Sequence, residues 1–261
     1  ISKFLNATTK DGYNPYRINK EGIDWEVVDE DDTWSHIGYW NDHQIIYLLK
    51  LLEGQWQIDR SFILDSLNKK IFSTANVPYK IRNDEEILKD PKNTIDFDHA
   101  LHQKIMNDVK KIGTDARLVL DQDQVVHVSM AEKLLVLQLS KLSNFIPDGG
   151  IWLNTQRPEW NDANNALVGY GVSMVTLYYL NRHISFINNV LKDVNETEFE
   201  MSNEVLAWFR ETKETYEKYS PSVNEQLNAV ERKTFVRELQ KLFSNYRQKT
   251  YNKSSSGEDK I

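Results

Sequence analysis

The sequence predicts a mainly α-helical protein with one small β-hairpin, and three observations support this fold class. Apolar residues recur at helical spacing over six or seven separate stretches of the 261-residue chain. Only one pair of short segments is typical of strands, and no strand–helix–strand repeat is present in the sequence. Helices with one apolar face alternate with helices that are apolar nearly all round, as helix hairpins in two concentric layers require.

The first predicted helix begins at Asn41 or Asp42, runs to Glu53 and is ended by Gly54. Its apolar residues cover most of its circumference, so we expect it to be deeply buried. A second helix follows, and Asp59 is the residue that can cap its N-terminus.

Residues 72–94 are predicted to be extended or looped, because Pro78 and Pro91 interrupt any helical pattern. A helix over residues 96–112 comes next. Its apolar residues are three or four positions apart, and Gly113 is a natural stop.

The predicted hairpin consists of residues 117–120 and 125–128, joined by a polar Asp-Gln-Asp-Gln turn. Ser129 and Glu132 then have the spacing of a capping box, which predicts the start of a helix that runs to Phe145.

A turn at residues 147–150 separates this helix from the C-terminal half. Ser220 is the expected N-cap of the last helix, with Pro221 at its first position. The three helices predicted after the turn span residues 166–191, 203–219 and 221–251.

We expect one helical domain over residues 1–252 and a frayed tail over residues 253–261, which is rich in Ser, Gly and charge. Residues 1–39 are predicted to form a long ordered loop, because their aromatic side chains need a surface to pack on. The chain begins with Ile1 rather than Met, which suggests a processed chain or a fragment of a longer one.

Composition argues against several classes of partner. The chain has 32 basic and 39 acidic residues and a net charge of -7, whereas nucleic acids and anionic membranes require a basic face. No apolar run approaches the roughly 18 residues of a membrane span. The absence of cysteine excludes disulfides, zinc–thiolate sites and thiol nucleophiles, and it suits a reducing compartment, so we expect a cytoplasmic protein.

The tripeptide Trp-Asn-Asp occurs twice, at 40–42 and at 160–162, each time before a predicted buried helix. From the counts of the three residue types, chance gives only about 0.05 copies. In the first copy, Asn41 and Asp42 stand at a helix start, so capping alone is an equally good explanation.

The second copy lies in a segment of unusual chemistry. Residues 156–165 contain two carboxylates, three Asn, a Gln, an Arg and a Trp, and Trp152 lies just upstream. Such amides and carboxylates can hold sugar hydroxyls, and a flat indole can hold the C–H face of the ring. Glycosidic cleavage also needs a carboxylic acid, which Asp162 or Glu159 can supply.

These motifs resemble the cellobiose and chitobiose phosphorylases. The resemblance rests on Trp160-Asn161-Asp162, the later Gly169-Tyr-Gly-Val-Ser173 and the upstream segment 38–43, Gly-Tyr-Trp-Asn-Asp-His. It implies an (α/α)6 toroid of six helix hairpins, of which this chain would supply about half, with the remainder as its partner.

The resemblance also implies the roles of the candidate residues. Asp162 would be the general acid of an inverting enzyme, and Asp42 would hold hydroxyls of an oligosaccharide substrate. Inorganic phosphate is a possible co-substrate; no cofactor or metal is expected. The sequence departs from the family at Ala163, where the family has Gly. The candidate catalytic residues are Asp162 and Glu159, and the candidate substrate-binding residues are Trp40, Asn41, Asp42, His43, Gln156, Arg157, Trp160, Asn161, Asn164 and Asn165.

Several alternatives stay open at the level of sequence. Hydrolysis would need a second carboxylate as base, with Glu159, Glu30 and Asp32 as candidates, whereas phosphorolysis would need none. A non-catalytic carbohydrate-binding or scaffold module would keep the Trp and Asn residues without depending on Asp162. His99 and His102 follow Asp96 and Asp98, so a divalent metal site is also conceivable. Asp/His clusters of this kind on helices are usually solvated faces.

Overall fold

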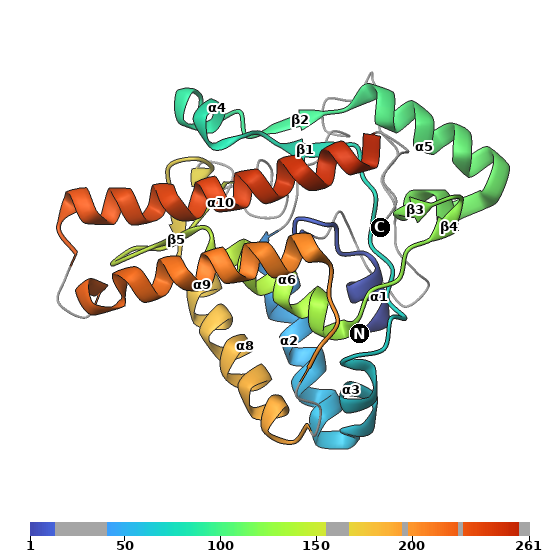
Figure 1. Ribbon diagram of the computed structural model, residues 1–261, viewed down its shortest axis with the longest axis horizontal. Helices are drawn as coiled ribbons and strands as arrows, with labels where there is room; N and C mark the ends of the chain where they lie inside the picture. The colour runs from blue at the N-terminus through green and yellow to red at the C-terminus, as the bar shows by residue number, and fades with distance from the viewer. Residues whose placement is uncertain (14–40, 155–166, 195–197, 224–226, 256–261) are drawn as a thin grey trace.

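The structure is a computed structural model that describes residues 1–13, 41–154, 167–194, 198–223 and 227–255, with backbone alone for 41–44, 221–223 and 253–255. Over these residues the chain is mainly helical, as predicted (Figure 1). The helices are α1 (Ser2–Asn6), α2 (Asn41–Ile58), α3 (Ser61–Ser66), α4 (Asp84–Lys89), α5 (His99–Ile112), α6 (Met130–Leu142), α8 (Met174–Lys192), α9 (Asn203–Val223) and α10 (Ala229–Ser255). The strands pair as β1 (Tyr79–Ile81) with β2 (Ile95–Phe97), β3 (Leu120–Asp121) with β4 (Gln124–Val125), and β6 (Gly150–Trp152) with both β5 (Phe145–Ile146) and β7 (Val172–Ser173). The described residues thus form three small antiparallel sheets where a single hairpin was predicted, because β1–β2 and β5–β6–β7 have strands of only two or three residues, too short to show a strand pattern.

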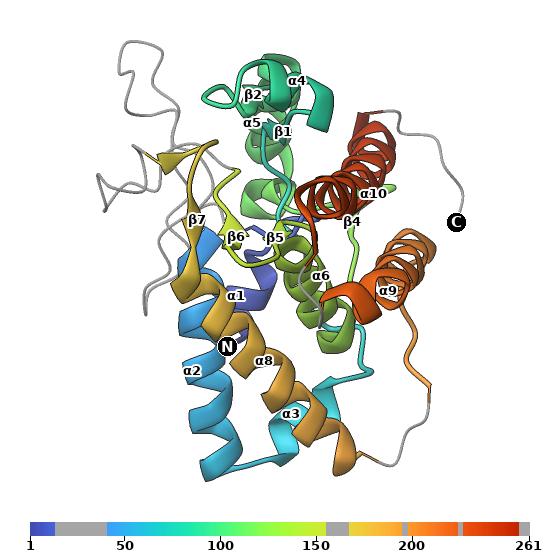
Figure 2. The same ribbon diagram turned by 90° about the vertical axis from the view of Figure 1, so that its left-hand side faces the viewer.

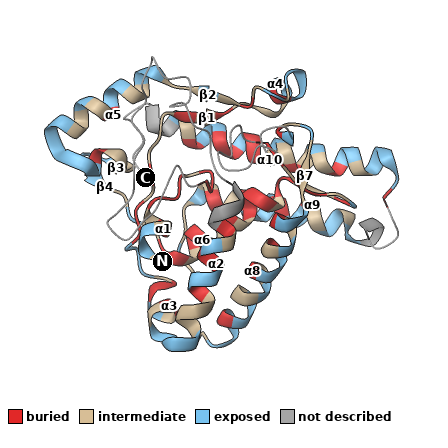
Figure 3. Cartoon of the chain, turned by 180° about the vertical axis from the view of Figure 1, so that it is seen from behind, coloured by how far each residue is buried: buried red, intermediate tan, exposed pale blue. Residues whose placement is uncertain are grey.

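Helix α6 lies at the centre of the molecule and is buried along most of its length (Figure 3). One of its faces contributes Leu134 and Leu137 to a core shared with α2, α3 and α8. Its other face contributes Val136 and Leu139 to a second core shared with α9, α10 and β1. Because α6 borders both cores, it fixes the position of every element that surrounds the candidate site.

The second core is built on aromatic stacking between α9 and α10. Trp208 of α9 is 1% exposed, and its ring stacks on Phe243 and Tyr246 of α10 with centroid distances of 4.8 and 4.2 Å. Farther along α9, Tyr216 contacts Phe235. Residues later in α9 thus meet residues earlier in α10, so the two helices form an antiparallel hairpin.

Several predicted elements are confirmed with shorter bounds. The helix expected at 96–112 is α5, which is capped by Asp98 and ended by Gly113 at a φ of 79°. The hairpin is β3–β4, and its turn residues Gln122 and Asp123 have positive φ. Ser129 caps α6 by accepting a hydrogen bond from the N–H of Glu132.

Two predicted helix ends are wrong. Gly54 does not end α2, which continues to Ile58, because the last turn brings Trp56 against Phe186 of α8. This packing outweighs the roughly 1 kcal/mol that a helical glycine costs. Pro221 does not start the last helix either, because α9 continues through it to Val223.

Other boundaries also differ from prediction. The helix expected from residue 166 starts only at Met174, because residues 172–173 form strand β7. The tail prediction is corrected at residues 253–255, which belong to α10. Helix α4 was not predicted; a capping box between Asn83 and Glu86 forms it within a segment too short to show helical periodicity.

Candidate functional site

Most of the candidate residues lie outside the described residues: Trp40, Gln156, Arg157, Glu159, Trp160, Asn161, Asp162, Asn164 and Asn165. Asn41, Asp42 and His43 form the first turn of α2, where the structure describes the backbone alone. The roles of these side chains therefore stay predictions. The described residues do fix where the two Trp-Asn-Asp segments join the core.

Helices α2 and α8 pack side by side and run in the same direction (Figure 2). Three contacts along the pair show the direction, because both residue numbers rise together. They are Lys50 with Tyr179, Glu53 with Arg182, and Trp56 with Phe186.

The parallel register places the start of α2 beside the residues that precede α8. In the first two contacts the residue of α8 is 129 positions later in the sequence than its partner in α2 (179 − 50 and 182 − 53). The same difference carried back to Met174, the first residue of α8, gives Ile45, so the first turn of α2 extends just beyond the start of α8. Figure 2 shows the start of α2 at the level of β6 and β7.

The described residues on either side of 155–166 meet at one narrow neck. The Leu153 N–H donates to the Gly171 carbonyl at 3.0 Å, and the Gly169 N–H donates to the Leu153 carbonyl at 2.8 Å. The indole Nε1 of Trp152 donates to the Gly169 carbonyl at 3.1 Å. Trp152 therefore closes this neck, a role that differs from the sugar platform suggested by its position in the sequence.

Gly169 is required at the neck for two separate reasons. Its φ of +78° is a conformation that side-chain-bearing residues rarely adopt. In addition, a Cβ atom at this position would lie 1.8 Å from the carbonyl oxygen of Pro91. The neighbouring Tyr170 contacts Lys92, the residue after Pro91. The Lys92 amine lies 5.1 Å from the centroid of the Tyr170 ring.

A hydrogen bond joins the points at which the two candidate segments leave the core. Tyr13 is the last described residue before 14–40, and Asn154 is the last before 155–166. The Tyr13 hydroxyl donates to Oδ1 of Asn154 at 3.2 Å, and both residues are buried. Burial raises the pKa of the Tyr13 phenol well above its usual range, so the hydroxyl stays a donor.

The same point carries a buried amine. Lys141 of α6 is fully buried, and its amine lies 4.4 Å from the centroid of the Tyr13 ring. Asn144, one turn farther along, is also buried and donates to the Ser140 carbonyl at 2.8 Å. The core at this point is thus polar, with amide, phenol and amine groups.

Sequence reasoning did not identify this group of Tyr13, Lys141, Asn144 and Asn154. Tyr13 and Asn154 are 141 positions apart, so no local pattern relates them. Lys141 gave no clear signal either, because it is one of five polar residues in α6, with Glu132, Lys133, Gln138 and Ser140.

Comparison with models of known protein families and with curated proteins finds no match. Within the described ranges, no group of three or more metal-binding side chains lies close enough together to hold a metal ion. No helix in that same part of the chain combines the length and hydropathy needed to cross a membrane.

Proposed function

We propose that this chain is part of a carbohydrate-active enzyme that cleaves glycosidic bonds of oligosaccharides with inversion, and that Asp162 is its general acid. The observation that supports the proposal is the parallel packing of α2 and α8, because the described residues that adjoin the two Trp-Asn-Asp segments therefore lie at one end of this helix pair. A cleavage site needs groups on both sides of the scissile bond, and two separate segments at one place can supply them.

The roles follow from the chemistry of each residue type. Asp162 protonates the leaving oxygen, with Glu159 as the other carboxylic acid in the segment. Trp40 and Trp160 offer flat faces to sugar rings. The hydroxyl groups are held by the polar candidates Asn41, Asp42, His43, Gln156, Arg157, Asn161, Asn164 and Asn165.

We further propose that the fold is part of an (α/α)6 toroid. Support comes from exposed apolar side chains on the two parallel helices: Tyr47 and Leu51 on α2, and Val175 and Tyr178 on α8, are all more than 40% exposed. Additional helices packed on this pair would bury them, as the outer layer of a toroid does.

The test is the phosphate dependence of cleavage, measured with a panel of α- and β-linked disaccharides and the longest native chain that contains this segment. Sugar 1-phosphate formed only when phosphate is added would identify a phosphorylase. Free sugar formed without phosphate would identify a hydrolase, and Glu159, Glu30 and Asp32 would then be examined as the base.

The alternative is a non-catalytic carbohydrate-binding module. It predicts sugar binding by the wild-type protein, no turnover with or without phosphate, and no effect of Asp162→Asn. Absence of both binding and turnover would reject both proposals.

A further inference from the structure

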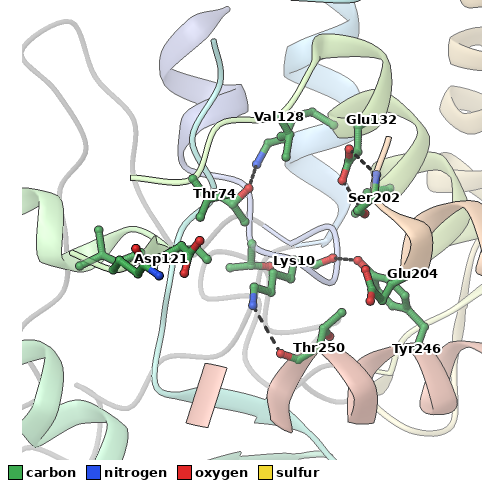
Figure 4. Close-up of a pocket in the computed structure, with 16 residues that line it drawn as sticks. Lys10, Thr74, Asp121, Val128, Glu132, Ser202, Glu204, Tyr246 and Thr250 are labelled. Atoms are coloured by element: carbon green, nitrogen blue, oxygen red, sulfur yellow. Dashed lines mark hydrogen bonds between the residues drawn. The ribbon is translucent and has the colours of Figure 1, made fainter. Parts of the chain in front are cut away.

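A separate cavity of about 240 Å³ lies against α6, away from the neck described above (Figure 4). Lys10, the β3–β4 hairpin and the facing parts of α9 and α10 close its other sides. Its apolar walls come from Val119, Val126, Val128 and Val136. Such a mixture of apolar wall and a few polar groups is typical of small-molecule sites.

Lys133 of α6 lines this cavity and is only 4% exposed. Its amine donates to the Thr8 carbonyl at 2.8 Å and to Oγ1 of Thr74 at 3.2 Å. Within the described part of the chain, no carboxylate oxygen lies within 4.0 Å of the amine. A buried amine without a close counter-ion favours its neutral form, and burial lowers the pKa of Lys133 to about 7.

The neighbouring Glu132 does not serve as that counter-ion. Its two carboxylate oxygens accept hydrogen bonds from the backbone N–H of Ser202 at 3.0 Å and from the Ser202 hydroxyl at 2.8 Å. The carboxylate thus binds the start of α9, as Figure 4 shows.

The hydrogen bonds of Lys133 suit a neutral amine, which has two N–H donors and one lone pair. Two acceptors, Thr8 and Thr74, account for the two donors. The lone pair is then left for reaction. Lysine amines desolvated in this way are nucleophiles toward carbonyl compounds.

The charges around the cavity restrict the compound that can enter. Asp121, Glu132 and Glu204 contribute three negative charges and Lys10 contributes one positive charge, which gives -2 when Lys133 is neutral. An anionic carbonyl compound is repelled by this lining, whereas an uncharged one is not. The volume admits only a small molecule.

From this geometry we propose that Lys133 forms a Schiff base with a small uncharged aldehyde or ketone in the α6 cavity. The amine nitrogen adds to the carbonyl carbon, and the carbonyl oxygen leaves as water with the two protons of the amine, so no oxidant or reductant is consumed. The Glu204 carboxyl group lines the same cavity and can exchange protons during the loss of water.

The experiment is reductive trapping of the wild-type protein with glycolaldehyde and cyanoborohydride, followed by peptide mass spectrometry of each lysine against time and pH. At pH 7 about half of the Lys133 amine is neutral, against roughly 1 in 2,500 for an ordinary lysine. Lys133 should therefore label at least about tenfold faster than exposed Lys69. Its rate should level off above about pH 8, because the amine is then almost entirely neutral.

Two comparisons separate reaction in the cavity from reaction at the surface. Glyoxylate, an anionic aldehyde of similar size, should label Lys133 more slowly than glycolaldehyde does. Val119→Phe, which fills part of the cavity without altering the amine, should slow labelling of Lys133 and leave Lys69 unchanged. Labelling of Lys133 no faster than Lys69 at pH 7, or a rate that keeps rising to pH 10, would overturn the proposal.

Discussion

His183 of α8 is fully buried and faces α6, where Nε2 of Gln138 lies 2.9 Å from its Nδ1. Its other ring nitrogen has no hydrogen-bond partner within the described residues. Burial lowers the pKa of His183 to about 4, so the folded protein holds this ring neutral.

The pH dependence of stability follows from that shift. The unfolded chain binds a proton at His183 below about pH 6.5, whereas the folded protein binds it only near pH 4. As the pH falls through this window, the free energy of unfolding should decrease by about 1.4 kcal/mol per pH unit. Urea unfolding at several pH values should show this decrease in the wild type and a smaller one in His183→Leu. If the free energy of unfolding fell equally steeply with pH in both proteins, the lowered pKa of His183 would be contradicted.

Lys133 should make the stability depend on pH in a second range, above that of His183. Its folded pKa of about 7 lies below the value of about 10.4 expected in the unfolded chain, so between these values only the unfolded state binds the proton. Stability should therefore rise with pH from 7 toward 10, by about 1.4 kcal/mol per unit more in the wild type than in Lys133→Met. Denaturant unfolding at pH 7, 8 and 9 measures the difference, and parallel curves would argue for an amine that stays charged.

Among the glycines that the structure describes, Gly169 at the neck is the one whose added Cβ would lie closest to another atom. Gly169→Ala places a Cβ atom against the Pro91 carbonyl at a positive φ, so we expect a loss of at least about 2 kcal/mol in the free energy of unfolding. Gly54→Ala is the matched control, because no atom lies within 4 Å of its added Cβ and the residue is helical. This control should be stabilising by about 0.5–1 kcal/mol. A Gly169→Ala protein as stable as the wild type would show that the neck is not closed as described.

Periodicity in the sequence predicted the existence of the long helices but not all of their ends. Trp56 shows why, since its contact with Phe186 across 130 positions extends α2 past Gly54. Strand β7 was missed for a similar reason, because two residues pair only when β6 lies beside them. Pairing partners distant in sequence decided both outcomes, and local propensity did not.

For the candidate site, the sequence predicted which residue types it contains and where they lie along the chain, but not how they are arranged in space. The recurrence of Trp-Asn-Asp indicated two related turns, but the connection between them depends on Tyr13 and Asn154, which no sequence pattern links. The parallel register of α2 and α8 likewise depends on tertiary packing.

At the scale of the whole molecule, the account requires the two Trp-Asn-Asp segments to lie together. Because seven residues of extended chain span at most about 25 Å, Asn161 can be no farther than that from Asn154. The chain has no cysteine, so pairs of engineered cysteines can be spin-labelled without background. If the two segments lie together, labels at Asn41→Cys and Asn161→Cys should be closer to each other than the labels of the control pair.

The control pair replaces the second label by one at Lys192→Cys, at the far end of α8. This position is about 27 Å along the helix axis from Met174, so the control distance should be longer. A distance between residues 41 and 161 that equals or exceeds the control would place the two segments apart.

The central claim is that Asp162 is the general acid of a glycosidic cleavage site. The most direct measurement compares turnover and sugar binding in the wild type, in Asp162→Asn and in the control Asp123→Asn, an exposed turn residue whose positive φ asparagine also tolerates. The account predicts that Asp162→Asn lowers turnover by at least about 100-fold while sugar affinity is retained, and that Asp123→Asn changes neither. Equal turnover in all three proteins would contradict it.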